Sequence, residues 1–199
     1  TGIGVRFYVN AGSPSVPSFL LRRATMTDTA GNAIQGAPIG VPALVDLNGD
    51  GTLDLLSSNI VNGSLNLYRN VGTRTDPRFA FVTDHLDNIL VLGDTCTTQG
   101  MLPKRTNLHG GAALRFADLH RSGVLDLYYG DLFSHGLFEM PNAGTPSAPQ
   151  LQCGTNRYPD ASLVNFGFNQ ASLVDIDGDG DLDLFVGVLN NMYRHGFWY

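Results

Sequence analysis

The chain has 199 residues, of which 43% are apolar, and this length is sufficient for one domain with a sizeable core. Acidic residues outnumber basic ones by 18 to 12 and give a net charge of −6. This balance argues against an electrostatic surface for nucleic acids. No apolar run has the length of a transmembrane helix. We therefore expect neither a nucleic-acid partner nor a membrane span.

A segment of the form Asn-x-Gly-Ser/Thr, followed by Pro-x-Phe or Pro-x-Leu, occurs three times. The copies begin at Asn10, Asn70 and Asn142, with spacings of 60 and 72 residues. Recurrence on this scale is typical of an array of supersecondary units. We expect a single repeat domain over residues 1–199. Its units are 11–70, 71–142 and 143–199, and residues 1–10 complete a neighbouring unit.

An acidic nonapeptide with two internal glycines lies before the second copy of this marker. Its candidate metal ligands are Asp46, Asn48, Asp50, Thr52 and Asp54. Calcium takes about six to eight oxygen ligands at close range. Side chains at loop positions 1, 3, 5 and 9, with the main-chain carbonyl of position 7, supply most of that shell. A solvated Asp/Gly turn explains only some of these residues, so we expect a calcium ion here.

A second copy of the nonapeptide is eroded. Its candidate ligands are Asp118, His120, Ser122, Val124 and Asp126. The copy keeps both end aspartates but carries His at position 3, Arg121 at position 4 and Ser at position 5. Calcium affinity follows ligand charge and rigidity, so we expect a weak or absent site. We expect His120 to be a surface loop residue, because no second His or Cys stands near it in the sequence.

The third copy of the nonapeptide is the most acidic. Its candidate ligands are Asp175, Asp177, Asp179, Asp181 and Asp183. Position 7, Asp181, is expected to contribute its carbonyl, and the other four residues their side chains. Glycine at positions 4 and 6 permits the positive φ that a tight wrap requires. We expect a second calcium ion in this loop.

Short apolar segments follow the three loops, at residues 53–56, 125–129 and 182–186, and their composition is typical of strands. Hairpin partners are expected at 64–70 and 135–140. No stretch shows a sustained 3.6-residue period, so we predict an all-β protein with almost no helix. A four-stranded unit cannot bury both its faces alone. Stacking such units around an axis gives β-propeller blades.

A dockerin or EF-hand loop is a further alternative for the acidic loops. Such a loop needs a bidentate Glu at position 12 and a helix after it. This chain has Ser57 and Val186 at those positions, within segments that look extended. The sequence therefore disfavours an EF-hand.

The chain has two cysteines, Cys96 and Cys153. Each lies between a Pro-x-Phe-like element and the next acidic loop, so the two could meet on adjacent units. The alternatives are a disulfide and two free thiols. A longer insert, residues 92–111 with Lys104 and Arg105, separates the second pair of markers. Such an insert is either a family-specific contact or a decorative loop.

The acidic motif, followed by Leu-Tyr-x-Asn-x-Gly-Thr and Pro-x-Phe, resembles the FG-GAP/VCBS family of repeats, which is also found in the integrin α-chain head. The resemblance extends from about residue 5 to 199. It implies a calcium-stapled β-propeller, usually of about seven blades, in a secreted or cell-surface protein. It also implies side-chain ligation of calcium at positions 1, 3, 5 and 9 of the first and third loops. Three repeats suggest part of a larger propeller, or an assembly whose terminal strands pair with neighbouring copies.

The expected function is that of a non-enzymatic, calcium-stabilised module serving adhesion, ligand binding or assembly outside the cell. Its partner would be a protein or glycan ligand at the cell surface, or copies of itself. Two alternatives stay open: a lectin-like propeller or accessory domain of a polysaccharide-degrading enzyme, and a structural protomer of an extracellular oligomer or filament. Several aromatic residues are expected in the core, with sugar stacking as the alternative: Tyr128, Tyr129, Phe133, Phe138 and residues 197–199.

Overall fold

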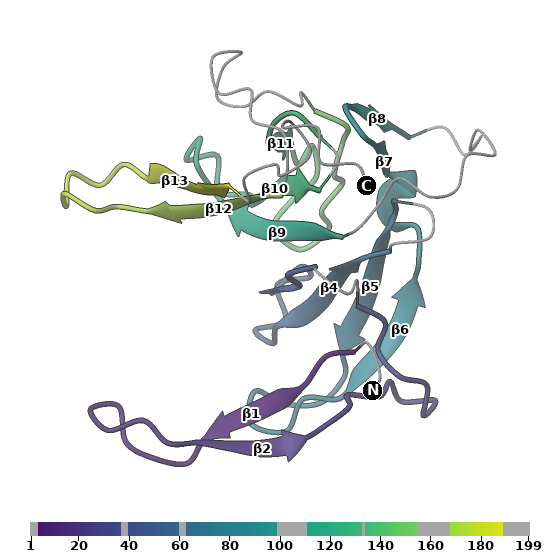
Figure 1. Cartoon of the computed structure of the whole chain (residues 1–199), viewed down its shortest axis with the longest axis vertical. Coiled ribbons are helices and arrows are strands. Elements are labelled where there is room, and N and C mark those ends of the chain that lie inside the picture. The colour runs from purple at the N-terminus through teal and green to yellow at the C-terminus, as the bar shows by residue number, and fades with distance from the viewer. Residues whose placement is uncertain are drawn as a thin grey trace, which may run out of the picture.

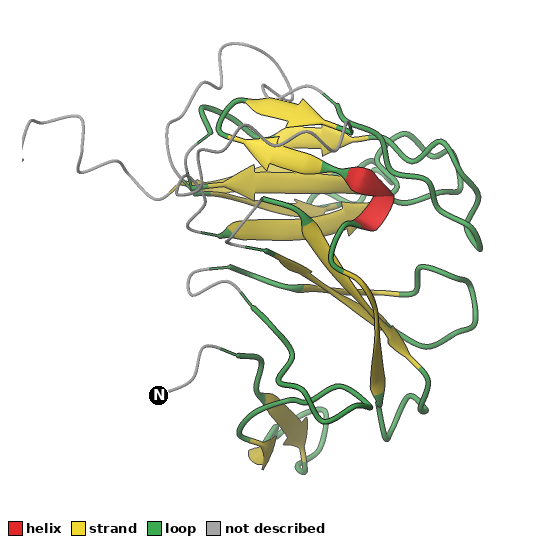
Figure 2. Cartoon of the chain, turned by 90° about the vertical axis from the view of Figure 1, so that its right-hand side faces the viewer, coloured by secondary structure: helices red, strands yellow, loops and turns green. Residues whose placement is uncertain are grey.

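The computed structural model describes residues 4–36, 40–59, 63–98, 111–132, 134–154 and 168–188. Within these ranges the protein is all-β, built from small antiparallel sheets, none of which is closed. The one helix among them is a three-residue 3₁₀ turn, η1 (Leu86–Asn88). The expectation of an all-β protein with almost no helix is confirmed for this part of the chain. Figures 1 and 2 show the arrangement from two sides.

The largest sheet is a four-stranded meander in the order β3-β4-β5-β6. Its strands are β3 (Ala43–Val45), β4 (Asp54–Ser58), β5 (Leu65–Asn70) and β6 (Phe79–Thr83). The first acidic loop connects β3 to β4, and the Asn70 marker connects β5 to β6. All five residues of β4 are buried, as is typical of a central strand covered on both faces.

A three-stranded sheet follows in the order β11-β10-β9. It contains β9 (Ala112–Ala117), β10 (Asp126–Asp131) and β11 (Phe138–Met140). An isolated bridge between Asn142 and Leu151 continues the pairing beyond β11. The middle acidic loop connects β9 to β10, which is the same place that the first loop has in the four-stranded sheet.

Two further sheets have only two strands each among the described residues. One pairs β1 (Phe7–Asn10) with β2 (Phe19–Arg23), and the other pairs β12 (Asn169–Val174) with β13 (Asp183–Val188). β1 and β2 flank an Asn marker, as β5 and β6 do, and so correspond to the last two strands of the four-stranded sheet. β12 and β13 flank an acidic loop, as β3 and β4 do, and correspond to its first two strands.

The strand pairing is offset from the predicted sequence units. β2 lies within unit 11–70 but pairs with β1, and β6 lies within unit 71–142 but pairs with β5. These two sheets therefore take their last strand from the next sequence unit. An additional hairpin lies at the start of the insert, where β7 (Leu90–Leu92) pairs with β8 (Thr95–Thr97).

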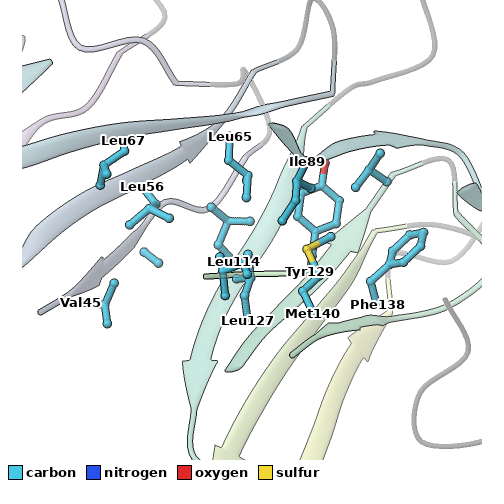
Figure 3. Close-up of a cluster of buried hydrophobic side chains, with 14 of the residues drawn as sticks. Val45, Leu56, Leu65, Leu67, Ile89, Leu114, Leu127, Tyr129, Phe138 and Met140 are labelled. Carbon is cyan, nitrogen blue, oxygen red and sulfur yellow. The ribbon is translucent and has the colours of Figure 1, made fainter. Parts of the chain in front are cut away.

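The sheets follow one another in chain order (Figure 1). Clusters of buried apolar side chains lie between neighbouring sheets. The largest core cluster joins the four-stranded and three-stranded sheets, with Leu56 and Leu67 on one side and Leu114 and Leu127 on the other (Figure 3). At their inner edges, Val41 pairs with Ala113 in a parallel bridge. Each of the three acidic loops therefore connects the first two strands of its sheet, and the three sheets follow one another in the stack.

Candidate metal sites

The first acidic loop is wrapped around its leading carboxylate. Asp46 accepts hydrogen bonds from the backbone N–H of Gly49 at Oδ1 and of Gly51 at Oδ2, both at 2.8 Å. The two glycines have φ of 71° and 83°, in the left-handed region where a side chain is strained. The glycines at positions 4 and 6 thus allow the backbone to close on Asp46.

The remaining ligand candidates of the first loop are oxygen donors on the same turn. Asp50 Oδ1 accepts hydrogen bonds from the Thr52 hydroxyl at 2.7 Å and backbone N–H at 2.8 Å, and its Oδ2 accepts one from the Asn48 amide at 2.7 Å. The Thr52 hydroxyl and the Asn48 amide lower the pKa of Asp50. Asp54 is buried, and its Oδ2 lies 3.2 Å from the guanidinium of Arg69. The loop therefore holds an ionised carboxylate at position 5 and a buried one at position 9.

The third loop repeats this wrap. Asp175 accepts hydrogen bonds from Gly178 N–H at 2.7 Å and Gly180 N–H at 3.0 Å, and these glycines have φ of 79° and 92°. Asp175, Asp177 and Asp179 each place a carboxylate oxygen within 4.8 Å of the other two. An all-oxygen, strongly anionic set of this kind suits a hard cation. The residues of the third loop fit calcium in donor type, charge and spacing.

The middle loop keeps the wrap but changes the side chains. Asp118 accepts hydrogen bonds from the N–H of Ser122 and of Gly123, both at 2.8 Å. Arg121 has φ of 54° at the position that glycine occupies in the other two loops. Its guanidinium reaches the third loop, where it lies 2.5 Å from the carboxylate of Asp181 and donates to the carbonyl of Gly180. The Ser122 hydroxyl in turn donates to the Val124 carbonyl at 3.4 Å.

His120 of the middle loop has a partner that sequence spacing did not identify. Its Nε2 lies 2.5 Å from Oε1 of Glu139 in β11, and this contact raises the pKa of His120. Glu139 is the only glutamate of the chain. It stands in the register position that Leu67 has in the four-stranded sheet, since Glu139 pairs with Tyr128 as Leu67 pairs with Leu56. A glutamate at a position where the preceding repeat has a leucine is the sequence feature that could have indicated this contact.

The three Asn markers form the same turn, here called the clasp, in which the asparagine side-chain oxygen accepts hydrogen bonds from two backbone N–H groups. Asn70 Oδ1 accepts hydrogen bonds from the N–H of Gly72 at 3.0 Å and of Arg78 at 3.1 Å. Asn10 and Asn142 bind the equivalent two N–H groups at 2.9 Å. A β-carbon on Gly72 would meet the carbonyl of Asp76 at 2.3 Å. The marker is therefore a structural turn between the last two strands of a sheet.

Cys96 and Cys153 form a disulfide with their Cα atoms 5.5 Å apart. Cys96 lies in β8 of the insert hairpin, and Cys153 follows the bridge between Asn142 and Leu151. Both pack against the largest core cluster. The bond therefore ties the insert hairpin to the next repeat. Lys104 and Arg105 of the insert lie outside the described residues.

Three aromatic residues considered for sugar stacking are core residues. Tyr128, Tyr129 and Phe138 are at most 1% exposed, and the rings of Tyr129 and Phe138 meet edge to face at 6.1 Å. Burial also raises the pKa of Tyr129 well above its ordinary value. These three rings cannot stack on an external sugar. Phe133 and residues 197–199 lie outside the described ranges.

The β4 and β13 strands that follow the first and third loops contradict an EF-hand, in which a helix would follow. No helix within the described ranges is long and apolar enough to cross a membrane. No family model matches this chain, and no match was found among curated proteins or solved structures.

Proposed function

We propose that the chain is a calcium-stabilised, non-enzymatic segment of a β-propeller of the FG-GAP/VCBS type, from a secreted or cell-surface protein that serves adhesion, ligand binding or assembly. The observation that supports it is the equivalence of the acidic loops. Each connects the first two strands of its sheet, and each wraps around its leading aspartate through two N–H groups. A repeated anionic turn at this point would let calcium hold the two strands together.

The disulfide supports the extracellular part of this proposal. Disulfides form and persist in oxidising compartments and are rare in the cytosol. Loops of this kind bind calcium usefully at the millimolar concentrations found outside cells. The Cys96–Cys153 bond and the two acidic loops therefore favour the same compartment.

Thermal unfolding across a calcium titration tests the proposal. Calcium at about 100 times its dissociation constant should stabilise the fold by about 2.7 kcal/mol per site, and magnesium should substitute poorly. Asp179→Ala should weaken calcium binding by about tenfold or more, because position 5 ligates through its carboxylate. Asp181→Ala is the matched control, because position 7 ligates through its carbonyl. Identical melting curves in EDTA and in millimolar calcium would contradict the proposal.

Self-assembly is a second candidate function, and the two-stranded sheets favour it. Strand β2 is exposed along its whole length, with Phe19 at 68%, and β13 exposes Phe185 at 49%. A cavity of about 540 Å³ separates β1 from the four-stranded sheet and is lined by apolar side chains, including Leu53 and Phe79. β1–β2 and β12–β13 match complementary halves of one four-stranded sheet. A repeat from a second copy would therefore cover these surfaces.

Native mass spectrometry separates this candidate from a monomeric module. Assembly predicts oligomers that dissociate on Phe185→Asp, because a charge in a packed sheet face is costly. Val82→Asp is a control on β6 of the complete sheet, where the side chain is 50% exposed. A monomer at micromolar concentration, in calcium and in EDTA, would exclude self-assembly of this chain.

A further inference from the structure

Three side chains of the middle repeat converge from three different elements. His120 comes from the acidic loop, Asp126 begins β10 and Glu139 lies in β11. Each offers one ligand atom, and these atoms all lie within 4.8 Å of one another. The set is one imidazole nitrogen and two carboxylates. Calcium prefers oxygen alone, whereas zinc and related divalent ions accept this mixture.

The other sheets of the protein show that this set is particular to the middle repeat. His120 replaces the oxygen donor that stands at position 3 of the other loops, Asn48 in the first. Glu139 replaces Leu67 of the four-stranded sheet. These two departures lie 19 residues apart in the sequence, and their side chains meet at 2.5 Å. The two departures from the repeat therefore meet beside Asp126, an aspartate that all three loops have at position 9.

Neighbouring groups outside the set orient both carboxylates. The Tyr128 hydroxyl donates a hydrogen bond to Glu139 Oε1 at 3.2 Å, and the backbone N–H of Asn142 donates one to Asp126 Oδ1 at 2.8 Å. Asp126 is buried and the Glu139 side chain is 16% exposed, whereas His120 is 57% exposed. Outer hydrogen bonds of this kind fix ligand orientation in metal sites. The exposed imidazole leaves one side of the set open to solvent.

We propose that the middle repeat binds a divalent transition-metal ion, of which zinc is the best-suited representative, through His120, Asp126 and Glu139. A neutral imidazole and two carboxylates balance the charge of one such ion. Three protein ligands also leave a coordination position for water or an external ligand. This site shares a loop with the doubtful calcium site but does not depend on calcium in the first or third loop.

Zinc titration by calorimetry into EDTA-stripped, dialysed protein tests the inference, with calcium in excess throughout. The wild type should bind one zinc ion that His120→Asn removes, because this change restores the residue of the first loop and leaves no nitrogen donor. The expected loss of affinity is more than about tenfold. His85→Asn is the matched control, since His85 is also an exposed histidine that contacts an aspartate, Asp84, at 2.7 Å. Cobalt should give a visible absorption band that is lost in parallel.

A second variant and a folding control distinguish loss of the zinc site from misfolding. Glu139→Leu introduces the residue that the four-stranded sheet has at the equivalent position, Leu67, and should also abolish zinc binding. A melting curve in EDTA, recorded for each variant, shows whether the variant is folded. Equal zinc binding by wild type and His120→Asn, or no zinc binding by the wild type at about 100 µM, would overturn the inference. Zinc binding that persists when calcium has no effect on stability would overturn the proposed calcium function instead, so the two failures are distinguishable.

Discussion

Asp54 Oδ1 accepts a hydrogen bond at 2.8 Å from the backbone N–H of Asn70, and this contact joins the two repeated motifs of the chain. Asp126 binds Asn142 in the same way at the same distance. The aspartate at position 9 of an acidic loop thus binds the backbone N–H of the marker asparagine, which lies at or just after the end of the third strand of the same sheet. The bond spans 16 residues in both repeats and both loops have nine residues, so the interval from Asp46 to Asn70 equals that from Asp118 to Asn142.

Asn142→Ala should destabilise the protein by about 1–3 kcal/mol. The change removes the acceptor of two backbone N–H groups, those of Gly144 and Gln150, and each hydrogen bond contributes about 0.5–1.5 kcal/mol. Urea unfolding at fixed calcium measures the loss. The exposed Gln152→Ala is the control and should change stability by less than about 0.5 kcal/mol. Equal stability of the two variants would show that the clasp is not needed.

Gly144→Ala should cost about 1–3 kcal/mol because a side chain there is overpacked. A β-carbon would meet the carbonyl oxygen of Ala148 at 2.2 Å and the nitrogen of Gln150 at 2.6 Å. Gly36→Ala is the matched control, since its β-carbon would meet only Val5, at 3.8 Å. Thermal unfolding compares them. A Gly144→Ala protein as stable as Gly36→Ala would mean that the turn relaxes freely.

The parts of this structure that the sequence could predict are held by nearby residues. Asp46 binds N–H groups three and five residues away, and Asn70 binds groups two and eight residues away. Such turns depend on their own residue types and recur wherever the motif recurs. Strands after the loops follow from short apolar runs between turns.

Contacts between sheets could not be predicted in this way. Arg121 reaches Asp181 across 60 residues of sequence, and Asp87 accepts a hydrogen bond from Leu151 N–H at 2.8 Å across 64. These pairs exist only because one sheet stacks on the next. The zinc set lies within one sheet, but its two repeat-specific residues are also distant in sequence, because His120 meets Glu139 only once β10 and β11 have paired.

Removal of the disulfide should lower the free energy of unfolding by about 2–4 kcal/mol. The cysteines are 57 residues apart, and the chain-entropy model gives about 4 kcal/mol for a loop of that length. The variant Cys96→Ser/Cys153→Ser should therefore melt roughly 5–15 °C lower than the wild type. Wild type in a reducing agent should melt like the variant. An unchanged melting temperature in both cases would show that the bond is dispensable.

Asp87→Asn should stabilise the protein at neutral pH and leave it unchanged at low pH. Burial raises the pKa of Asp87 above its ordinary value of 3.8, although the Leu151 N–H opposes the shift. An acid whose pKa is raised in the folded state does not lower the free energy of unfolding while it is protonated in both the folded and the unfolded state. Its cost grows as the pH rises from 3.8 through the folded pKa and is constant above it.

Urea unfolding of both proteins between about pH 3 and 7 measures this difference. Asparagine keeps an acceptor for Leu151 and tolerates the φ of 51° at this position. The stability of the variant relative to wild type should therefore rise with pH and then level off. A difference that is the same at every pH would exclude a contribution from the charge of Asp87.

Restoring the middle loop should add one calcium ion per chain. The variant His120→Asn/Arg121→Gly/Ser122→Asp reproduces the residues of the first loop at positions 3, 4 and 5. It adds a carboxylate, removes a guanidinium and returns glycine to a position whose φ is 54°. Calorimetric titration measures the stoichiometry. The reverse change, Asn48→His/Gly49→Arg/Asp50→Ser, should remove one calcium ion from the first loop.

Of these two variants, only the restored middle loop should exchange one metal for another. The restored middle loop lacks His120 and should lose zinc as it gains calcium, since a nitrogen donor favours zinc and an added carboxylate favours calcium. The altered first loop should lose calcium without gaining zinc, because Leu67 stands where the middle repeat has Glu139. An altered first loop that did gain zinc would show that a histidine in the loop is sufficient, without a glutamate at the position of Leu67.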